Sequence, residues 1–240
     1  MSTKIDLFLN ETYLSHGITK WVSWDMALAP HVIITGQSGS GKTYASKILL
    51  AKLSLTTACE TYVLDYKSDT DFDFLRGCKN FYRYTDCHNG LHDFYKRFTL
   101  RQNGTDKSRY PLILFFDEWS SYCNAGEKKV IEEDKKILGL LISLSRSFSC
   151  HVVISQQTFH AVYFNQYRES ISCCIMMGNG SEEARKMLFP DYAKDIPSDR
   201  SRGRGFIAFN NLEPVPILVP KIRNRMLVQN AIRNSVVPPL

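Results

Sequence analysis

The stretch Gly36-Gln37-Ser38-Gly39-Ser40-Gly41-Lys42-Thr43 constrains the fold of this 240-residue chain more than any other feature. It matches the pattern G-x-x-x-x-G-K-[ST] and lies between the apolar run 31–36 and a helical pattern, so it should join a buried strand to a helix. Its glycines let successive backbone N–H groups point at phosphate oxygens, and the dipole of the helix favours negative charge. These residues are predicted to bind a nucleoside triphosphate, with Lys42 on its β- and γ-phosphates and the Thr43 hydroxyl on Mg²⁺.

Short β-branched or aromatic runs alternate with helical stretches along the chain. This alternation predicts an α/β fold with a mostly parallel central sheet and helices on both faces. Ligands of such sheets bind at the carboxyl ends of the strands, so the chemistry is expected at or just after Thr35, Asp65, Phe116 and Ser155. Strands are expected at 31–36, 61–66, 80–84, 111–118, 151–155 and 171–178, and helices from Gly41 and at 91–101, 127–146 and 181–189.

The C-terminal part of the chain carries two further strands and a basic segment. Prolines 214, 216 and 220 suggest that the runs 205–210 and 214–220 form an antiparallel pair or edge strands. No repeat or low-complexity linker divides the chain. We therefore expect one domain over residues 1–222, with a strand and loop extension at 1–30 and a basic tail at 223–240.

Composition excludes several classes of protein. A hydrophobic content of 44% is ample for a packed core, and no apolar run approaches the roughly 20 residues of a membrane span. The N-terminus lacks the apolar segment of a signal peptide, which favours a cytoplasmic protein. The seven cysteines form no C-x-x-C pair, so neither a disulfide framework nor a zinc knuckle is expected. His31, His151 and His160 show no metal-ligand spacing and are assigned core or surface roles.

Two carboxylates end the most apolar strand of the sequence. Asp117 is placed to hold the Mg²⁺ coordination sphere, and Glu118 follows it directly. Neighbouring residues at a strand end point in different directions, so one carboxylate can face the metal while the other faces the attacking water. The pair therefore favours nucleotide hydrolysis. The alternative is that Glu118 only caps the helix that follows.

Gln156 and Gln157 end the strand at 151–155. A glutamine at this point can hydrogen-bond both water and phosphate, and so report whether the γ-phosphate is present; Gln156 is the residue to which we assign this role. A polar strand end without a function is equally consistent with the position.

The positive charge of the chain is concentrated at its C-terminal end. Residues 200–240 carry a net charge of +6, which is the formal net charge of the whole chain. A basic end on a neutral body suggests a polyanionic partner or arginines that reach phosphate, and a solvated arginine-rich surface is the competing interpretation. Arg200, Arg202 and Arg204 form a basic loop that is expected to contact DNA phosphates or a neighbouring subunit.

Together these segments resemble the FtsK/SpoIIIE motor domain of the FtsK–HerA P-loop ATPases over roughly residues 18–222. The run 29–36 is similar to the family's entry to the phosphate loop, 63–67 to its second strand, and Asp117-Glu118 to its Walker-B pair. The segment 146–156 is similar to its "R-x-x-G-x-H" stretch leading into "T-Q", although Ser149 and Ser155 replace the family's glycine and threonine.

The resemblance implies a RecA-like ATPase that uses ATP and Mg²⁺, assembles as a hexameric ring and threads double-stranded DNA. It implies that Arg146 acts in trans as an arginine finger on a neighbour's ATP; a charge at a helix C-terminus is the alternative. We expect neither the family's additional domains nor a membrane anchor in this chain. We therefore expect an ATP-driven DNA translocase that moves or packages the DNA of a mobile element, plasmid or virus. The alternative is a non-motor ATP-binding regulatory or scaffold protein that acts through a protein partner.

Overall fold

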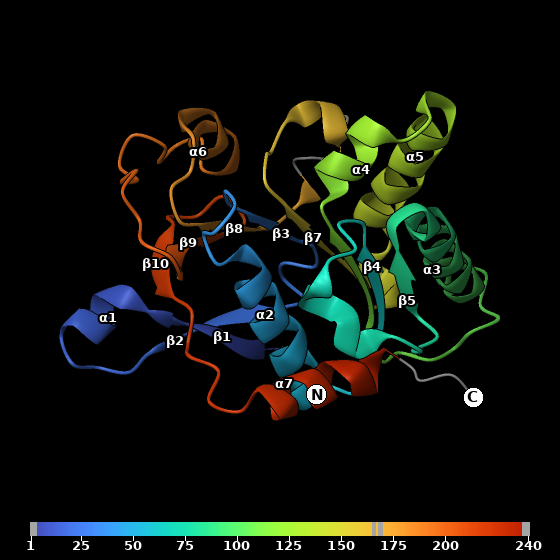
Figure 1. Cartoon of the computed structure of the whole chain (residues 1–240), viewed down its shortest axis with the longest axis horizontal. Helices are drawn as coiled ribbons and strands as arrows, with labels where there is room; N and C mark the ends of the chain where they lie inside the picture. The colour runs from blue at the N-terminus through green and yellow to red at the C-terminus, as the bar shows by residue number, and fades with distance from the viewer. Residues whose placement is uncertain (1–3, 165–166, 168–169, 237–240) are drawn as a thin grey trace.

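The computed structural model describes residues 4–164, 167 and 170–236, and over these residues one ten-stranded sheet runs through the molecule (Figure 1). The strand order is β2-β1-β10-β9-β8-β3-β7-β6-β4-β5. The strands are β1 (Lys4–Asn10), β2 (Trp21–Asp25), β3 (Val32–Thr35), β4 (Glu60–Asp65), β5 (Phe81–Arg83), β6 (Leu112–Asp117), β7 (Cys150–Gln156), β8 (Cys173–Met177), β9 (Arg204–Phe209) and β10 (Val215–Leu218).

The sheet has a parallel half and an antiparallel half. The six strands from β8 to β5 are parallel, whereas β9, β10, β1 and β2 extend the sheet in antiparallel pairings. The expected α/β fold is confirmed, and so is the antiparallel pair near the C-terminus. Pro216 is tolerated inside the sheet because β1 contacts β10 only at Ile217 and Leu218, so no neighbour on that side needs the missing N–H.

Two layers of helices cover the sheet, and each closes its own apolar core. On one face α2 and α7 pack against the strands, and on the other α3, α4, α5 and α6 do so. Every residue of β6 is buried because both of its faces are covered, which explains its unbroken apolar sequence. The helices are α1 (Glu11–Ser15), α2 (Lys42–Thr56), α3 (Cys87–Gln102), α4 (Trp119–Ala125), α5 (Lys128–Leu144), α6 (Glu182–Leu188) and α7 (Arg225–Ser235).

Both ends of the described chain belong to the domain. The extension expected at 1–30 contains β1 and β2, whose Leu7 and Trp24 are fully buried. The stretch expected as a basic tail contains α7, capped by Asn224, and it places Ala231 and Ile232 in the core beside α2. Of the basic residues of this segment, Arg225 is exposed at the start of α7, whereas Arg233 is half-buried and donates hydrogen bonds to the carbonyls of Phe74 and Arg76, which the charge count did not reveal. Within the described residues, no helix is both long enough and apolar enough to cross a bilayer.

Candidate functional site

The phosphate-binding loop connects β3 to α2 at the carboxyl edge of the parallel half. Gly39 and Gly41 have φ values of +81° and +98°, which only glycine adopts without strain. A Cβ atom on Gly41 would lie 3.2 Å from the backbone nitrogen of Gly203, which donates a hydrogen bond of 3.0 Å to the carbonyl of Ser40. The loop therefore keeps the curled backbone that the motif predicts, and the segment before β9 supports it from the side.

Strand alternation brings three polar residues to the face on which α2 lies. Asp117 on β6 is in register with Asp65 on β4 and Ser155 on β7. Each lies two residues after an apolar residue of the core beside α2, and therefore points to the same face of the sheet. Asp117 is 3% exposed, and its Oδ1 atom has no hydrogen-bond partner. Burial raises the pKa of Asp117 to about 6, against the opposing effect of Lys42. A buried oxygen with a free lone pair beside the loop suits a hard cation such as Mg²⁺, with Thr43 as the second protein ligand.

Glu118 turns the chain from β6 into α4. Its φ of +60° is left-handed, and its side chain makes no hydrogen bond to the backbone at the N-terminus of α4. Glu118 Oε1 instead lies 2.6 Å from Lys42 Nζ in a buried ion pair. Ser121 Oγ donates to Glu118 Oε2 at 3.3 Å, and Gln157 Nε2 donates to Oε1 at the same distance. The carboxylate thus reaches the phosphate-binding loop, which the helix-capping alternative does not require.

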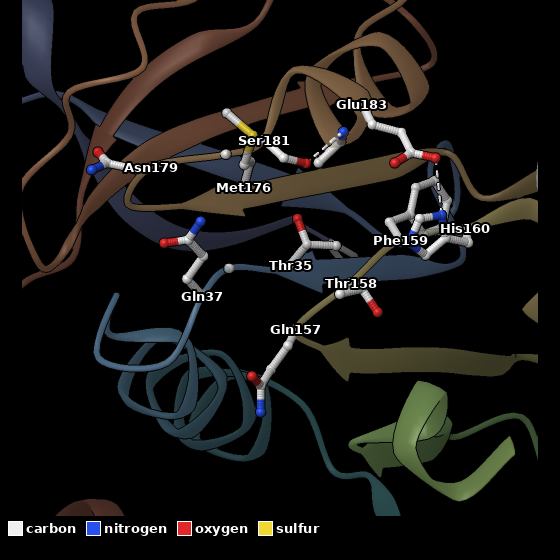
Figure 2. A pocket seen from close by; sticks show the side chains of 13 residues that line it. Thr35, Gln37, Gln157, Thr158, Phe159, His160, Met176, Asn179, Ser181 and Glu183 are labelled. Carbon is white, nitrogen blue, oxygen red and sulfur yellow. Dashed lines mark hydrogen bonds and ion pairs between the residues drawn. The ribbon is translucent and has the colours of Figure 1, made fainter. Parts of the chain in front are cut away.

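The two glutamines at the end of β7 face different surroundings. Gln157 reaches Glu118 and extends from the strand toward α2 (Figure 2). Gln156 is fully buried beside Thr35 of β3, and neither atom of its amide has a hydrogen-bond partner. Gln157 lines the cleft over the loop and Gln156 does not, and a role of Gln156 at the γ-phosphate stays a prediction. A strand end changes face with every residue, so the sequence pattern could not choose between them.

A cleft of about 260 Å³ lies over the phosphate-binding loop and is lined by four basic side chains and by two acids, Asp71 and Glu118, which pair with Lys47 and Lys42. Lys47 and Lys67 line it in addition to Lys42, and Arg202 closes it from the segment before β9. A second hollow, of about 100 Å³, adjoins the loop between Thr35, Gln37 and the start of α6 (Figure 2). Lys47, Lys67 and Arg202 lie outside the motif Gly36–Thr43, so its spacing did not predict them at the nucleotide.

The three arginines of the predicted basic loop differ in their contacts. Arg200 forms an ion pair of 2.8 Å with Glu11 of α1, and Arg204 pairs with the same carboxylate. Arg202 lines the cleft over the phosphate-binding loop of its own chain. Contact with DNA or a neighbouring subunit stays a prediction for all three, and two of them already have a partner within the fold.

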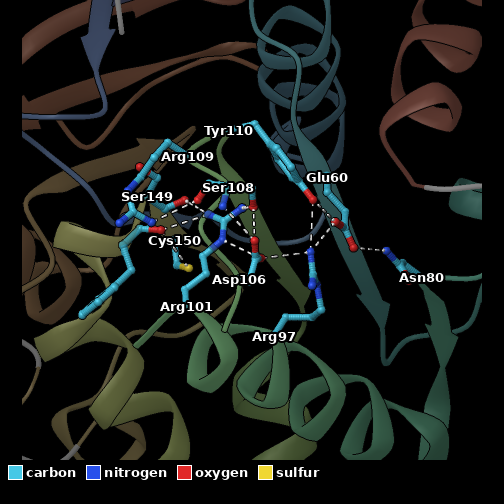
Figure 3. A network of polar contacts seen from close by, with 11 residues as sticks. Glu60, Asn80, Arg97, Arg101, Asp106, Ser108, Arg109, Tyr110, Ser149 and Cys150 are labelled. Atoms are coloured by element: carbon cyan, nitrogen blue, oxygen red, sulfur yellow. Dashed lines mark hydrogen bonds and ion pairs between the residues drawn. The ribbon is translucent and has the colours of Figure 1, made fainter. Parts of the chain in front are cut away.

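Arg146 lies at the amino edge of the sheet, at the end opposite the phosphate-binding loop. It is exposed and follows the C-terminus of α5, beside a hollow of about 1120 Å³ that Arg109 and His151 also line. The fully buried Arg101 supports the segment that carries it: Arg101 Nη1 donates to the carbonyls of Phe148 and Ser149 at 2.9 and 3.3 Å (Figure 3). Arg146 therefore cannot reach the loop of its own chain.

The sequence of this chain is similar to that of a known protein. The chain is 22% identical over 236 residues to the FtsK domain-containing protein YdcQ of Bacillus subtilis (strain 168), an alignment that covers 92% of this chain and 49% of YdcQ. No family model matches the chain. The chain thus spans about half the length of the curated relative it matches.

The fold is shared with solved ATPase structures. The cytoplasmic domain of the Thermomonospora curvata type VII secretion ATPase EccC matches with a TM-score of 0.73 and 17% identity, covering 100% of this chain and 33% of that chain. The pCW3 conjugation coupling protein TcpA, in its monomer form with ATPγS, matches with a TM-score of 0.68 and 17% identity, covering 91% and 66%. The resemblance to the FtsK–HerA ATPases is confirmed: the chain is a homologue of an FtsK domain-containing protein and has the fold of these ATPases.

Proposed function

We propose that this chain hydrolyses ATP with Mg²⁺ and works as a ring-forming motor on double-stranded DNA. The observation that carries the proposal is the pair of carboxylates beside the loop: a buried Asp117 with an unpartnered oxygen, and Glu118 in contact with Lys42. Both groups face the point where the loop is shaped to receive phosphate.

Lys42 and Glu118 have to separate before hydrolysis. A triphosphate in the loop competes with Glu118 for Lys42, because phosphate oxygens carry more negative charge than one carboxylate. Release of Lys42 leaves Glu118 as a buried carboxylate that is free to accept a proton from water. Gln157 and Ser121 hold Glu118 during this exchange. Bound Mg²⁺, held by Thr43 and Asp117, would supply positive charge to the phosphate oxygens.

A ring accounts for the distance between Arg146 and the loop. The two lie at opposite edges of the sheet, so head-to-tail packing of copies brings the amino edge of one chain toward the carboxyl edge of the next. The Arg146 guanidinium of each copy would then stabilise charge on its neighbour's transferring phosphoryl group. Double-stranded DNA is proposed as the substrate because of the family resemblance, the basic C-terminal part, and the relation to a conjugation coupling protein.

The test measures ATP turnover at several protein concentrations, with and without duplex DNA. The proposal expects turnover that rises with DNA and more steeply than linearly with protein concentration. Glu118→Gln should abolish turnover and keep ATP binding, whereas Glu127→Gln, at the exposed start of α5, should match the unchanged protein. Normal turnover in Glu118→Gln would refute its role as the base.

Mixing two inactive variants tests the ring directly. Lys42→Ala removes the loop's cation, and Arg146→Ala removes the finger, so each variant alone should be inactive. In a mixture, a subunit with intact Lys42 can lie beside a neighbour with intact Arg146, and part of the activity should return. No recovery in the mixture would contradict catalysis in trans.

A non-motor ATP switch is the second candidate. The Lys42–Glu118 ion pair favours this candidate, because a bound nucleotide has to break the pair and so changes the state of the site. This candidate predicts ATP binding and slow turnover that no nucleic acid changes.

A further inference from the structure

Three side chains on the face of the sheet opposite α2 form a cluster that the nucleotide site does not use. His88 and His92 lie one helical turn apart on α3, and Asp134 lies on the neighbouring α5. Asp134 Oδ1 is 3.1 Å from His88 Nδ1 and 3.0 Å from His92 Nε2. One potential ligand atom from each residue lies within 4.8 Å of those of the other two.

We propose that His88, His92 and Asp134 bind a divalent transition-metal ion, with Zn²⁺ as the expected ion. Two imidazoles and one carboxylate are a donor set that Zn²⁺ takes in proteins, and histidines at positions i and i+4 present their rings on one side of a helix. Zinc–nitrogen and zinc–oxygen bonds of about 2.0 Å separate the ligand atoms of a tetrahedron by about 3.3 Å. The observed nitrogen–oxygen separations are close to that spacing, so small side-chain movements would admit the ion.

The charge around Asp134 supports a cation. The side chain of Asp134 is fully buried, and among the residues that the structure describes no lysine or arginine forms an ion pair with it. Lys135, next in the chain, pairs with Glu132. A buried carboxylate is costly unless it is paired, hydrogen-bonded or bound to a metal. Hydrogen bonds from the two histidines and from Tyr122, without a metal, are the competing explanation, and the experiment below separates the two.

A further residue orients the carboxylate as metal sites require. Tyr122 Oη donates a hydrogen bond to Asp134 Oδ2, which also lies 3.1 Å from His88 Nδ1. Outer hydrogen bonds of this kind fix the direction of a ligand carboxylate. The side chains of His88 and His92 are 35% and 26% exposed, so an ion and a water ligand can enter from solvent.

The position of the cluster defines what the ion would do. It would join α3 to α5, and through Tyr122 it would reach α4, the helix that begins directly after Glu118. The Tyr122 ring also packs at 5.2 Å from Phe116, the residue before Asp117. The ion would therefore be structural, holding three helices on the far side of the sheet from the nucleotide.

The experiment titrates Zn²⁺ into the chelator-treated full chain, kept reduced, by calorimetry without nucleotide. We expect one ion per chain, with at least a tenfold loss of affinity in both His88→Ala and His92→Ala. Tyr122→Phe should weaken binding roughly tenfold to a hundredfold, as expected for an outer hydrogen bond. His160→Ala is the matched control, because His160 pairs with Glu183 at the surface away from the cluster.

Two further readouts keep the proposal falsifiable. Zn²⁺ should raise the melting temperature of the unchanged chain and leave that of the His88→Ala, His92→Ala double variant unmoved. Co²⁺ in place of Zn²⁺ should give visible absorption without a thiolate charge-transfer band. Equal affinity in the double variant, no saturable binding, or a thiolate band from one of the seven cysteines would each overturn the proposal.

Discussion

Two groups of buried polar side chains, one at each edge of the parallel half, differ in how far their hydrogen bonds are satisfied. At the amino edge, the guanidinium of Arg101 is fully buried and has a partner on every side: Asp106, Ser108 and the carbonyls of Phe148 and Ser149 (Figure 3). At the carboxyl edge, side-chain atoms of Asp117, Ser155 and Gln156 are buried without hydrogen-bond partners.

This difference separates structural polarity from functional polarity. A satisfied network stabilises the fold and fixes the segment it holds, here the one that precedes β7 and carries Arg146. Buried polar groups without hydrogen-bond partners cost stability, and a protein retains them where a bound ligand supplies the missing partners. The following substitutions test that division through the free energy of unfolding without nucleotide, from the largest expected effect to the smallest.

Arg101→Met should have the largest effect. It removes the hydrogen bonds of the guanidinium to Asp106, Ser108 and the carbonyl of Phe148, and loss of one partner of a buried charged network costs about 3–5 kcal/mol. Urea unfolding of the variant measures the loss. Arg109→Ala is the matched control, because this exposed arginine makes one contact, to the carbonyl of Ser108, and its loss should cost under about 0.5 kcal/mol. Equal effects of the two substitutions would show that the network is not stabilising.

Asp117→Asn should stabilise the nucleotide-free protein. The pKa of Asp117 is raised to about 6 in the fold, so ionisation is easier in the unfolded chain. The resulting cost is absent below about pH 4, grows as the pH rises, and is complete above about pH 6, where it is on the order of 3 kcal/mol.

The check compares unfolding of Asp117→Asn and the unchanged protein at about pH 4 and about pH 8. The gain in the free energy of unfolding should appear only at the higher pH. Asp191→Asn, at an exposed position shortly after α6, should show no such gain. A variant that is less stable at both pH values would contradict the assignment.

Gln156→Leu should leave stability unchanged or raise it by about 1 kcal/mol, because it removes a buried amide whose polar atoms have no partner. Gln157→Leu is its counterpart, and should lower ATP turnover with little change in stability because Gln157 contacts Glu118. Calorimetric unfolding and steady-state turnover of both variants distinguish the two roles. A large loss of stability in Gln156→Leu would indicate an unrecognised structural contact.

Arg204→Ala should have the smallest effect. The side chain of Arg204 is 41% exposed, and partly exposed ion pairs contribute about 0–1 kcal/mol. The difference from the unchanged protein should shrink as salt is added, because salt screens exposed charges. A larger loss that salt does not reduce would show that the pairing with Glu11 is part of the core.

The nucleotide site shows which functional residues can be predicted from local sequence patterns and which cannot. A motif that joins strand, loop and helix is contiguous, so Gly36–Thr43 could be assigned from spacing alone, and the apolar run before Asp117 located the acidic pair. The choice between Gln156 and Gln157 depended on the side to which the end of β7 turns. The contribution of Arg202 depended on a contact between segments that are distant in the sequence, the hydrogen bond from Gly203 to Ser40.

The His88, His92 and Asp134 cluster could also be predicted only in part from the sequence. The spacing of the two histidines was present in the sequence, but the third member lies on another helix, 42 residues beyond His92. The basic C-terminal part is a parallel case, since its charge count suggested a tail and its helix packs in the core.

The sequence by itself determined the phosphate-binding loop, the α/β class and the acidic strand end, because each arises from residues adjacent in the chain. Only the tertiary structure decided which polar groups are left without partners, which arginines are already paired and which histidines meet a carboxylate. Those outcomes depend on contacts between distant segments, and local spacing does not specify such contacts.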